Sequence, residues 1–388
     1  MISLIKSTFY KEADTKRKLC EFILSADKLS IGEQCQTFEE NFARWQGRKH
    51  CVMFNSGSSA NLALIQALLN DGIIAPNSAV GFSAITWATN VMPLLQLSLR
   101  PVPVDVGLNT LNISVETLTE AYEREPFSCL FLTNLLGLSD DIEGVRTFCN
   151  AHNIVLIEDN CESLGSEFEH TKLGNFGIAS TFSFFVGHHL STIEGGAVCT
   201  DDPELATSLR MIRSHGWDRH LDSETQIRIR EKHGIKEFYA KYTFYSLAYN
   251  LRPTELQGFL GTNQLQYLDE MVAKREKNYD QLSVVYQHNP NLIPIQDMMS
   301  THSNFAFPLV CKNVEAKERL LEKCAIADIE TRPMVGGLMT KQPFYARHVE
   351  NLPLSLPNAE LLHTNSFYVG NNPELTPEEL AIMIATLS

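Results

Sequence analysis

The sequence has no hydrophobic run long enough to span a bilayer, since the apolar stretch 91–99 is short and contains Pro93. Residues 1–20 mix acidic and basic side chains and contain no apolar core of signal-peptide length. Basic residues are in the minority: 32 Lys and Arg stand against 46 Asp and Glu, and the formal net charge is -14. A surface that neutralises nucleic-acid phosphates needs clustered Lys and Arg. We therefore expect a cytoplasmic globular protein that binds neither nucleic acid nor membranes.

Cysteine pairs at metal-binding or redox spacing are also missing. The nine cysteines are an odd count, no two of them form a CxxC pair, and Cys51, Cys129, Cys161 and Cys199 lie in apolar runs. Such residues are typical of buried, reduced thiols in a cytoplasmic protein. The sequence predicts no metal site.

Short apolar runs alternate with helical patterns, which predicts an α/β fold with strands joined by crossover helices. A helix is expected at 57–69 with Ser56 as its N-cap, and a long helical pattern covers 254–279. In the C-terminal part, strands at 302–310 and 326–332 surround a helix at 317–323. A chain of 388 residues can form one large and one smaller domain, which we assign to 1–250 and 251–388. The strands expected in the large domain are 50–54, 79–82, 101–105, 129–133, 154–158, 179–185 and 197–200.

Small and polar motifs follow several of these strands. Residues 54–60 (FNSGSSA) join a strand to a helix start, where free N–H groups and the helix dipole favour a phosphate. Gly57 would let the backbone approach that phosphate and Ser58 could donate to it; an ordinary small-residue turn is the alternative. Thr86 and Trp87 are expected to open the next helix, after a strand and a loop. The indole of Trp87 could stack on a flat ring or pack in the core.

A carboxylate and a histidine complete the set. Asp159 ends an apolar strand, where open α/β sheets bind ligands in a crevice, although a helix N-cap is the alternative. His188 and His189 diverge as neighbours, and no third ligand lies at metal spacing. We interpret His188 as a proton shuttle with the unperturbed histidine pKa of about 6.5. The segment HGWDR at 215–219 offers His215 and Arg219 to an anion, or else is a solvated loop.

Taken together and in this order, the motifs resemble the DegT/DnrJ/EryC1 sugar aminotransferases. The resemblance runs from about residue 29 to the C-terminus, so it covers nearly the whole chain. It rests on SGSSA at 56–60, TW at 86–87, ED at 158–159, Ser183, EGG at 194–196, HG at 215–216 and NLRPTELQ at 250–257. It implies a fold type I, aspartate aminotransferase-like structure that binds pyridoxal 5′-phosphate (PLP), with a large mixed-sheet domain, a smaller C-terminal α+β domain and a homodimer with shared active sites.

Such a site normally carries a lysine at position 188, and no lysine occurs between Lys172 and Lys232. With a histidine at this position, the sequence resembles the sugar 3-dehydratases of the family. These enzymes of deoxysugar and lipopolysaccharide O-antigen biosynthesis use pyridoxamine 5′-phosphate (PMP), which is regenerated with L-glutamate. The resemblance implies a PLP/PMP-dependent lyase that removes the C3 hydroxyl of a GDP-linked 4-keto-6-deoxyhexose. Beyond Cys199 only Cys311 and Cys324 remain, so an iron–sulfur cluster and its reductase are not expected.

The resemblance also assigns roles to single residues. His188 is the catalytic acid and base. Arg332, His215 and Arg219 are weaker candidates for holding glutamate or the sugar nucleotide. The expected cofactor contacts are Gly57, Ser58 and Ser183 at the phosphate, Asn250 from a neighbouring subunit, Trp87 on the ring face, Asp159 at the ring nitrogen and Glu162 near the ring hydroxyl.

One departure from the family pattern concerns position 187. Gly187 replaces a hydroxyl residue there, which removes one phosphate contact and could lower cofactor affinity. Two alternative functions stay open at this point. One is a sugar-nucleotide aminotransferase slowed by His188, and the other is a non-catalytic homologue that only binds sugar nucleotides.

Overall fold

The computed structural model describes residues 1–350 and 354–388. Its main sheet has seven strands in the order β1-β9-β8-β5-β4-β2-β3. Strands β2, β3, β4, β5 and β8 run parallel, and β9 pairs antiparallel with both β1 and β8, so the sheet is mixed as predicted. The strands are β1 (His50–Phe54), β2 (Ala79–Ser83), β3 (Arg100–Val104), β4 (Cys129–Thr133), β5 (Val155–Asp159), β8 (Ala179–Ser183) and β9 (Gly196–Thr200). Each lies within two residues of its predicted bounds.

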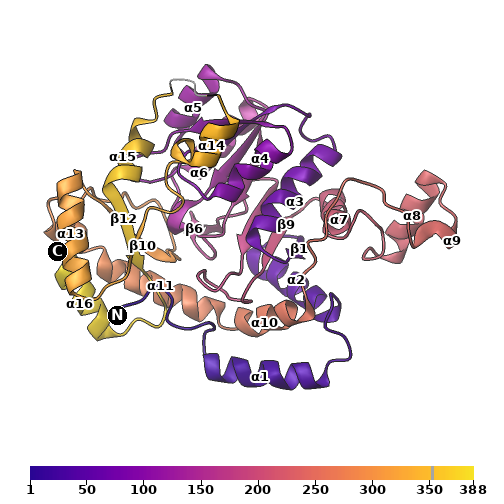
Figure 1. Ribbon diagram of the computed structural model, residues 1–388, viewed down its shortest axis with the longest axis horizontal. Coiled ribbons are helices and arrows are strands. Elements are labelled where there is room, and N and C mark those ends of the chain that lie inside the picture. The colour runs from indigo at the N-terminus through magenta and orange to yellow at the C-terminus, as the bar shows by residue number, and fades with distance from the viewer. Residues whose placement is uncertain (351–353) are drawn as a thin grey trace.

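Helices cover both faces of this sheet because its strands are apolar on both sides. On one face, Val52 and Phe54 pack with the buried side chains of α3 (Gly57–Asn70) and α7 (Pro203–Ile212). The opposite face packs against α5 (Val115–Arg124) and α6 (Ile142–Ala151). Figure 1 shows these layers around the sheet. The remaining elements of this part are α2 (Glu33–Gln46), α4 (Met92–Gln96), the 3-10 helices Ala88–Asn90 and Leu135–Gly137, and the hairpin β6 (Glu167–Phe168) and β7 (Thr171–Lys172).

A second, three-stranded antiparallel sheet lies in the C-terminal part. Its order is β10 (Ala306–Val310), β12 (Ser366–Gly370) and β11 (Thr331–Pro333). The strands predicted at 302–310 and 326–332 are therefore shorter, whereas the helix predicted at 317–323 is longer. Helices of this part are α12 (Val285–His288), α13 (Val314–Ile326), α14 (Pro343–His348), α15 (Pro357–Asn365), α16 (Pro377–Leu387) and the 3-10 helix Met339–Lys341.

The helical pattern at 254–279 forms two helices instead of one. These are α10 (Glu255–Leu265) and α11 (Leu268–Leu282), and the chain leaves helical hydrogen bonding at Gln266 and Tyr267. Helix α10 packs on α2 of the main sheet domain. Because such contacts join the two parts, the division at residue 250 stays a prediction.

The first residues of the chain lie beside the small sheet, which the C-terminal part of the chain forms. Ile2 pairs with Ile329 in parallel, and the Leu4 N–H donates to the Glu330 carboxylate at 3.0 Å. Lys6 forms an ion pair with Glu379. This N-terminal strap, residues 1–7, therefore joins the beginning of the chain to its end.

Two helical segments stand apart from the sheets in Figure 1. Helix α1 (Glu12–Ser25) lies beside α10, and α8 (Ser223–His233) with α9 (Glu237–Ala240) forms an arm that projects from the body. Apolar side chains are exposed on this arm and beyond it, at Phe238, Tyr242 and Leu247. Within the described residues, no helix has both the length and the apolar character to cross a membrane.

Candidate active site

A pocket of about 730 Å³ opens where β4, β5 and β8 end, between the main sheet and the C-terminal part. The carboxyl ends of parallel strands are where open α/β sheets bind ligands. Thr133, Asp159 and Ser183 are the last residues of these three strands, and all three line the pocket. Eight predicted site residues meet in it: Gly57, Ser58, Trp87, Asp159, Glu162, Ser183, His188 and Arg332.

The start of α3 forms one corner of this pocket. Ser56 is extended and its hydroxyl accepts from the Ser59 N–H at 3.1 Å, so the predicted N-cap is confirmed. A Cβ on Gly57 would lie 2.7 Å from the Cβ of Ser183, a distance that real side chains do not tolerate. Glycine therefore allows the helix start and Ser183 to approach one another, and together they form a cradle suited to an anion.

Trp87 and Asp159 lie on the next part of the wall. The Trp87 side chain is 55% exposed, so the alternative of a core tryptophan is wrong. Asp159 is 4% exposed, and its Oδ1 accepts from the Cys161 N–H at 2.9 Å. No helix begins at Asp159 in the described chain, which excludes the N-cap alternative.

His188 follows β8 and is partly buried. Its ring lies between those of Phe185 and Phe305, at centroid distances of 6.2 and 5.7 Å, and its Nδ1 is buried without a hydrogen-bond partner. Burial lowers the pKa of His188 to about 4, and the Asp159 charge only partly opposes this shift. The sequence-based expectation of a pKa near 6.5 therefore differs from the structure, because burial, and to a smaller extent the Arg275 charge, disfavour the cation. At neutral pH, His188 is an uncharged proton acceptor.

His189 diverges from His188, as expected of neighbours. It is buried, and its Nε2 lies 2.5 Å from the Ser303 carbonyl oxygen. The pair cannot bind one metal ion, and the described residues contain no group of three His, Cys, Asp or Glu that could hold one.

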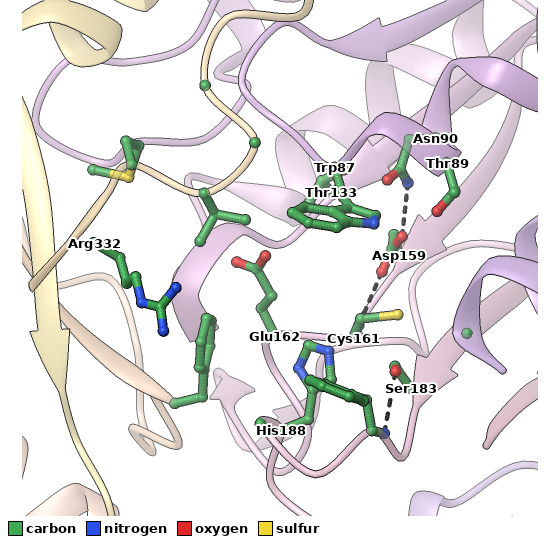
Figure 2. Close-up of a pocket in the computed structure, with 18 of the residues that line it drawn as sticks. Trp87, Thr89, Asn90, Thr133, Asp159, Cys161, Glu162, Ser183, His188 and Arg332 are labelled. Atoms are coloured by element: carbon green, nitrogen blue, oxygen red, sulfur yellow. Dashed lines mark hydrogen bonds between the residues drawn. The ribbon is translucent and has the colours of Figure 1, made fainter. Parts of the chain in front are cut away.

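The pKa of Glu162 shifts in the direction opposite to that of His188. Burial raises its pKa to about 8, and the nearby Asp159 charge adds to the rise, although the Leu136 N–H donates to its carboxylate at 2.8 Å. Near neutral pH, Glu162 is therefore protonated and can donate a hydrogen bond. A neutral base and a neutral acid thus lie in the same pocket (Figure 2).

Arg332 lies across the pocket from this pair, on β11 (Figure 2). Its Nη2 donates to the Glu330 carboxylate at 2.7 Å, and its side chain is 58% exposed. Among the described residues, no other arginine lines the pocket. Its guanidinium can therefore reach an anionic ligand.

Three predicted site residues lie outside this pocket. Asn250 pairs with Ser214 in an isolated bridge, the His215 N–H donates to the Tyr249 carbonyl at 2.6 Å, and the Arg219 guanidinium lies 3.9 Å from the Trp217 ring centre. They lie at the base of the projecting arm, so the structure of one chain does not bring them to His188. Their proposed roles stay predictions.

Sequence reasoning missed several residues of the wall. Asn61 follows Gly57 by four positions on α3, so helical periodicity could have placed it on the same face. Thr133 ends a predicted strand, and Thr89, Asn90, Cys161, Phe185 and Met334 lie within three residues of predicted site residues, so proximity in sequence could have suggested them. Besides Asn61, the complete set of missed residues is Leu4, Ile5, Thr89, Asn90, Thr133, Cys161, Phe185, Phe305, Met334, Val335, Gly336, Gly337, Gln342, His363 and Tyr368.

The cysteines mostly match the expectation of buried thiols. All nine are free, and Cys51, Cys129 and Cys199 are buried. Cys161 is instead partly exposed and lines the pocket beside Asp159.

The chain belongs to the DegT/DnrJ/EryC1/StrS aminotransferase family, whose model matches residues 11–388. Its fold is that of the fold type I PLP-dependent transferases, as the resemblance implied. Among individual proteins, it is 33% identical over 374 residues to the GDP-4-keto-6-deoxy-D-mannose 3-dehydratase of Escherichia coli O55:H7, with 92% of this chain and 93% of that protein covered.

Solved structures of a 3-dehydratase of the same name agree with this relationship. One holds a trapped PLP-glutamate geminal diamine; it has a TM-score of 0.90 and 31% identity, and both chains are covered in full (100%). Another is a mutant with bound GDP-perosamine, with a TM-score of 0.90, 30% identity and the same 100% coverage of both chains.

Proposed function

We propose that this protein is a PLP/PMP-dependent 3-dehydratase that removes the C3 hydroxyl of a GDP-linked 4-keto-6-deoxyhexose and uses L-glutamate to regenerate PMP. One observation carries the proposal. A histidine, with no lysine beside it in the described pocket wall, faces Asp159 and Trp87. A lysine at position 188 would bind PLP covalently and return a proton to the sugar, which gives an amino sugar. An imidazole cannot form that bond.

The pocket residues fit the cofactor. The cradle of Gly57, Ser58 and Ser183 suits its phosphate, the exposed Trp87 ring suits its flat face, and Asp159 suits its ring nitrogen. When bound, the cofactor supplies an electron sink for bond breaking beside the 4-keto carbon. Gly187 brings no hydroxyl to the phosphate, so Ser183 and the start of α3 carry more of that contact.

His188 moves the proton in this scheme. Its neutral imidazole would accept a proton on the cofactor side of the pocket and would then deliver it to the departing C3 hydroxyl, which leaves as water. A pKa of about 4 makes the protonated ring a strong acid, which favours that delivery. The remaining product hydrolyses to a 3-deoxy-4-keto sugar and ammonia. Protonated Glu162 donates to the ring hydroxyl of the cofactor without adding a second negative charge beside Asp159.

The test is product analysis by mass spectrometry, with purified protein, PLP, glutamate and GDP-, CDP- and dTDP-linked 4-keto-6-deoxy sugars. We expect a 3-deoxy-4-keto product and ammonia from the GDP-linked sugar. An amino sugar would instead establish the aminotransferase alternative. Binding of the sugar nucleotides without any product would establish a non-catalytic homologue.

We further propose that the protein is cytoplasmic and forms a homodimer whose two chains share their active sites. The apolar side chains exposed on the projecting arm (Phe238) and in the segment after it (Tyr242 and Leu247) support a partner at this surface. Asn250 follows the arm and lies outside its own pocket, so it would reach the phosphate of the partner's cofactor.

Mixed dimers test this arrangement. A His188→Asn chain and an Asn250→Ala chain are each expected to be weakly active alone, whereas a dimer of one of each contains one complete site. Co-expression with two affinity tags, followed by an activity assay of the doubly tagged fraction, should therefore recover activity. If the mixed dimer stays as weak as its parents, Asn250 does not act across the interface.

A further inference from the structure

Two asparagines meet at one oxygen of Asp159. The Asn61 Nδ2 donates to Asp159 Oδ2 at 3.0 Å, and the Asn90 Nδ2 donates to the same atom at 2.7 Å. Asn61 comes from α3 and Asn90 from the 3-10 helix after Trp87, so separate segments converge on this carboxylate. Both asparagines are buried, at 1% and 0% exposure, and both line the pocket. Figure 2 shows Asn90 directed at Asp159.

The Asp159 carboxylate fixes the orientation of both amides. Turning either amide around would set its carbonyl oxygen against Asp159 Oδ2, and two acceptors repel. In the observed orientation, the Oδ1 atoms of Asn61 and Asn90 are buried without a partner. A buried polar atom left unpaired destabilises the fold. Both residues therefore direct their donors at Asp159 while their own carbonyl oxygens stay unpaired.

The chemistry explains why asparagine stands at both positions. Two N–H donors stabilise a carboxylate in its charged form. An arginine or lysine would do the same, but its positive charge would repel a protonated ring nitrogen a few ångströms away. Neutral amides stabilise Asp159 without that repulsion. With Oδ1 held by the Cys161 N–H, the whole carboxylate is fixed in direction.

We propose that Asn61 and Asn90 are positioning residues that hold the Asp159 carboxylate aimed at the ring nitrogen of the cofactor. The inference rests on the cofactor assigned under the proposed function, but not on dehydration or on the identity of the sugar. It assigns no contact between either asparagine and the substrate.

The experiment uses the full chain with Asn61→Leu, Asn90→Leu and the double variant. Leucine matches asparagine in size and removes the donor. Asn371→Leu is the matched control, because Asn371 is also fully buried and donates to the Arg275 and Asn304 carbonyls, not to Asp159. Circular dichroism melting checks that each variant folds, and Asn90→Ser replaces Asn90→Leu if the leucine variant does not.

Two measurements test the proposal. The ¹⁵N chemical shift of bound PMP, labelled at the ring nitrogen, reports whether that nitrogen is protonated. Single-turnover absorbance follows the conversion of bound PLP to PMP by glutamate. We expect the double variant to move the shift toward the neutral pyridine value and to slow the glutamate reaction about ten- to a hundred-fold, as expected for hydrogen bonds to a charged group. The control should leave both unchanged.

An unchanged ¹⁵N shift in a folded double variant with bound PMP would overturn the inference, and so would an equal shift in Asn371→Leu. Both measurements omit the sugar. A chain that makes amino sugars would therefore refute the dehydratase and leave this inference standing.

Discussion

The pocket wall formed by the ends of β4, β5 and β8 can be compared with the opposite wall, which residues 332–337 form. On the first wall, Asp159 is buried and accepts three hydrogen bonds. On the second wall, Arg332 is 58% exposed and bonds Glu330, a neighbour two residues away. The Asp159 carboxylate is thus held by side chains from distant segments, whereas the Arg332 side chain bonds a near neighbour.

The loop wall owes its position to glycine. Gly336 has a φ of +60°, and a Cβ there would lie 1.8 Å from the Thr86 carbonyl oxygen. The loop can therefore press against the segment that carries Trp87. We therefore expect changes on the strand wall to affect the cofactor reaction, and the change at Arg332 to affect binding of the sugar nucleotide. Four changes test this division of labour.

The largest effect is expected from His188→Asn. Removing the shuttle should lower turnover about 10²- to 10⁴-fold, the usual contribution of a general acid–base group, while PMP still binds. Product formation by mass spectrometry and PMP affinity by fluorescence titration measure the two properties. His170→Asn is the control, since His170 is exposed and lies outside the pocket. Undiminished turnover would remove the histidine from the mechanism.

Arg332→Ala should weaken binding of the sugar nucleotide and leave the cofactor reaction unchanged. Loss of a charge-assisted hydrogen bond of about 1.5–3 kcal/mol raises KM for the sugar nucleotide about ten- to a hundred-fold, and the glutamate reaction keeps its rate. Steady-state kinetics of both substrates give the comparison, with the exposed Arg347→Ala as control. A slower glutamate reaction would show that the loop wall also serves the cofactor step.

The pH dependence of the glutamate reaction should have two limbs. The rate rises as pH increases through about 4, because His188 loses its proton and becomes a base. It falls as pH increases through about 8, because Glu162 loses the proton that it donates. At pH 9 only about a tenth of Glu162 stays protonated, so the rate drops about ten-fold. Glu162→Gln keeps a donor that does not titrate, and stopped-flow traces should then lack the upper limb.

The smallest effect is expected from Trp87→Ala. Loss of ring stacking, about 0.5–1.5 kcal/mol, should weaken PMP binding about two- to ten-fold and leave the KM for glutamate nearly unchanged. Trp45→Ala is the control, because Trp45 bonds Asp269 on α11 and does not line the pocket. Equal affinity in Trp87→Ala and the wild type would contradict stacking.

Local signals in the sequence sufficed for much of the strand wall. Each buried strand is a continuous apolar run, so the end of the strand at 154–158, and hence Asp159, could be located. Ser183 was expected inside a strand at 179–185 and instead ends β8. The start of α3 followed from Ser56 and Gly57. The break between α10 and α11 could not be predicted, because the helical pattern continues through Gln266 and Tyr267 and only tertiary packing interrupts it.

Long-range features of the site were out of reach for the same reason. Nothing near Asn90 in the sequence indicates that it meets Asp159, and nothing near Ile5 places it at the pocket. The pKa of His188 is lowered by burial and also by the charge of Arg275, which comes from a distant helix. Such properties arise only when distant segments pack.

The N-terminal strap has a consequence for how the protein matures in the cell. Leu4 and Ile5 are synthesised some three hundred residues before Ile329, Glu330 and Glu379, which hold the strap. Until those later residues leave the ribosome the strap has no docking surface, so this side of the pocket stays unfinished. A nascent chain can therefore fold its seven-stranded sheet well before it has a finished catalytic chamber.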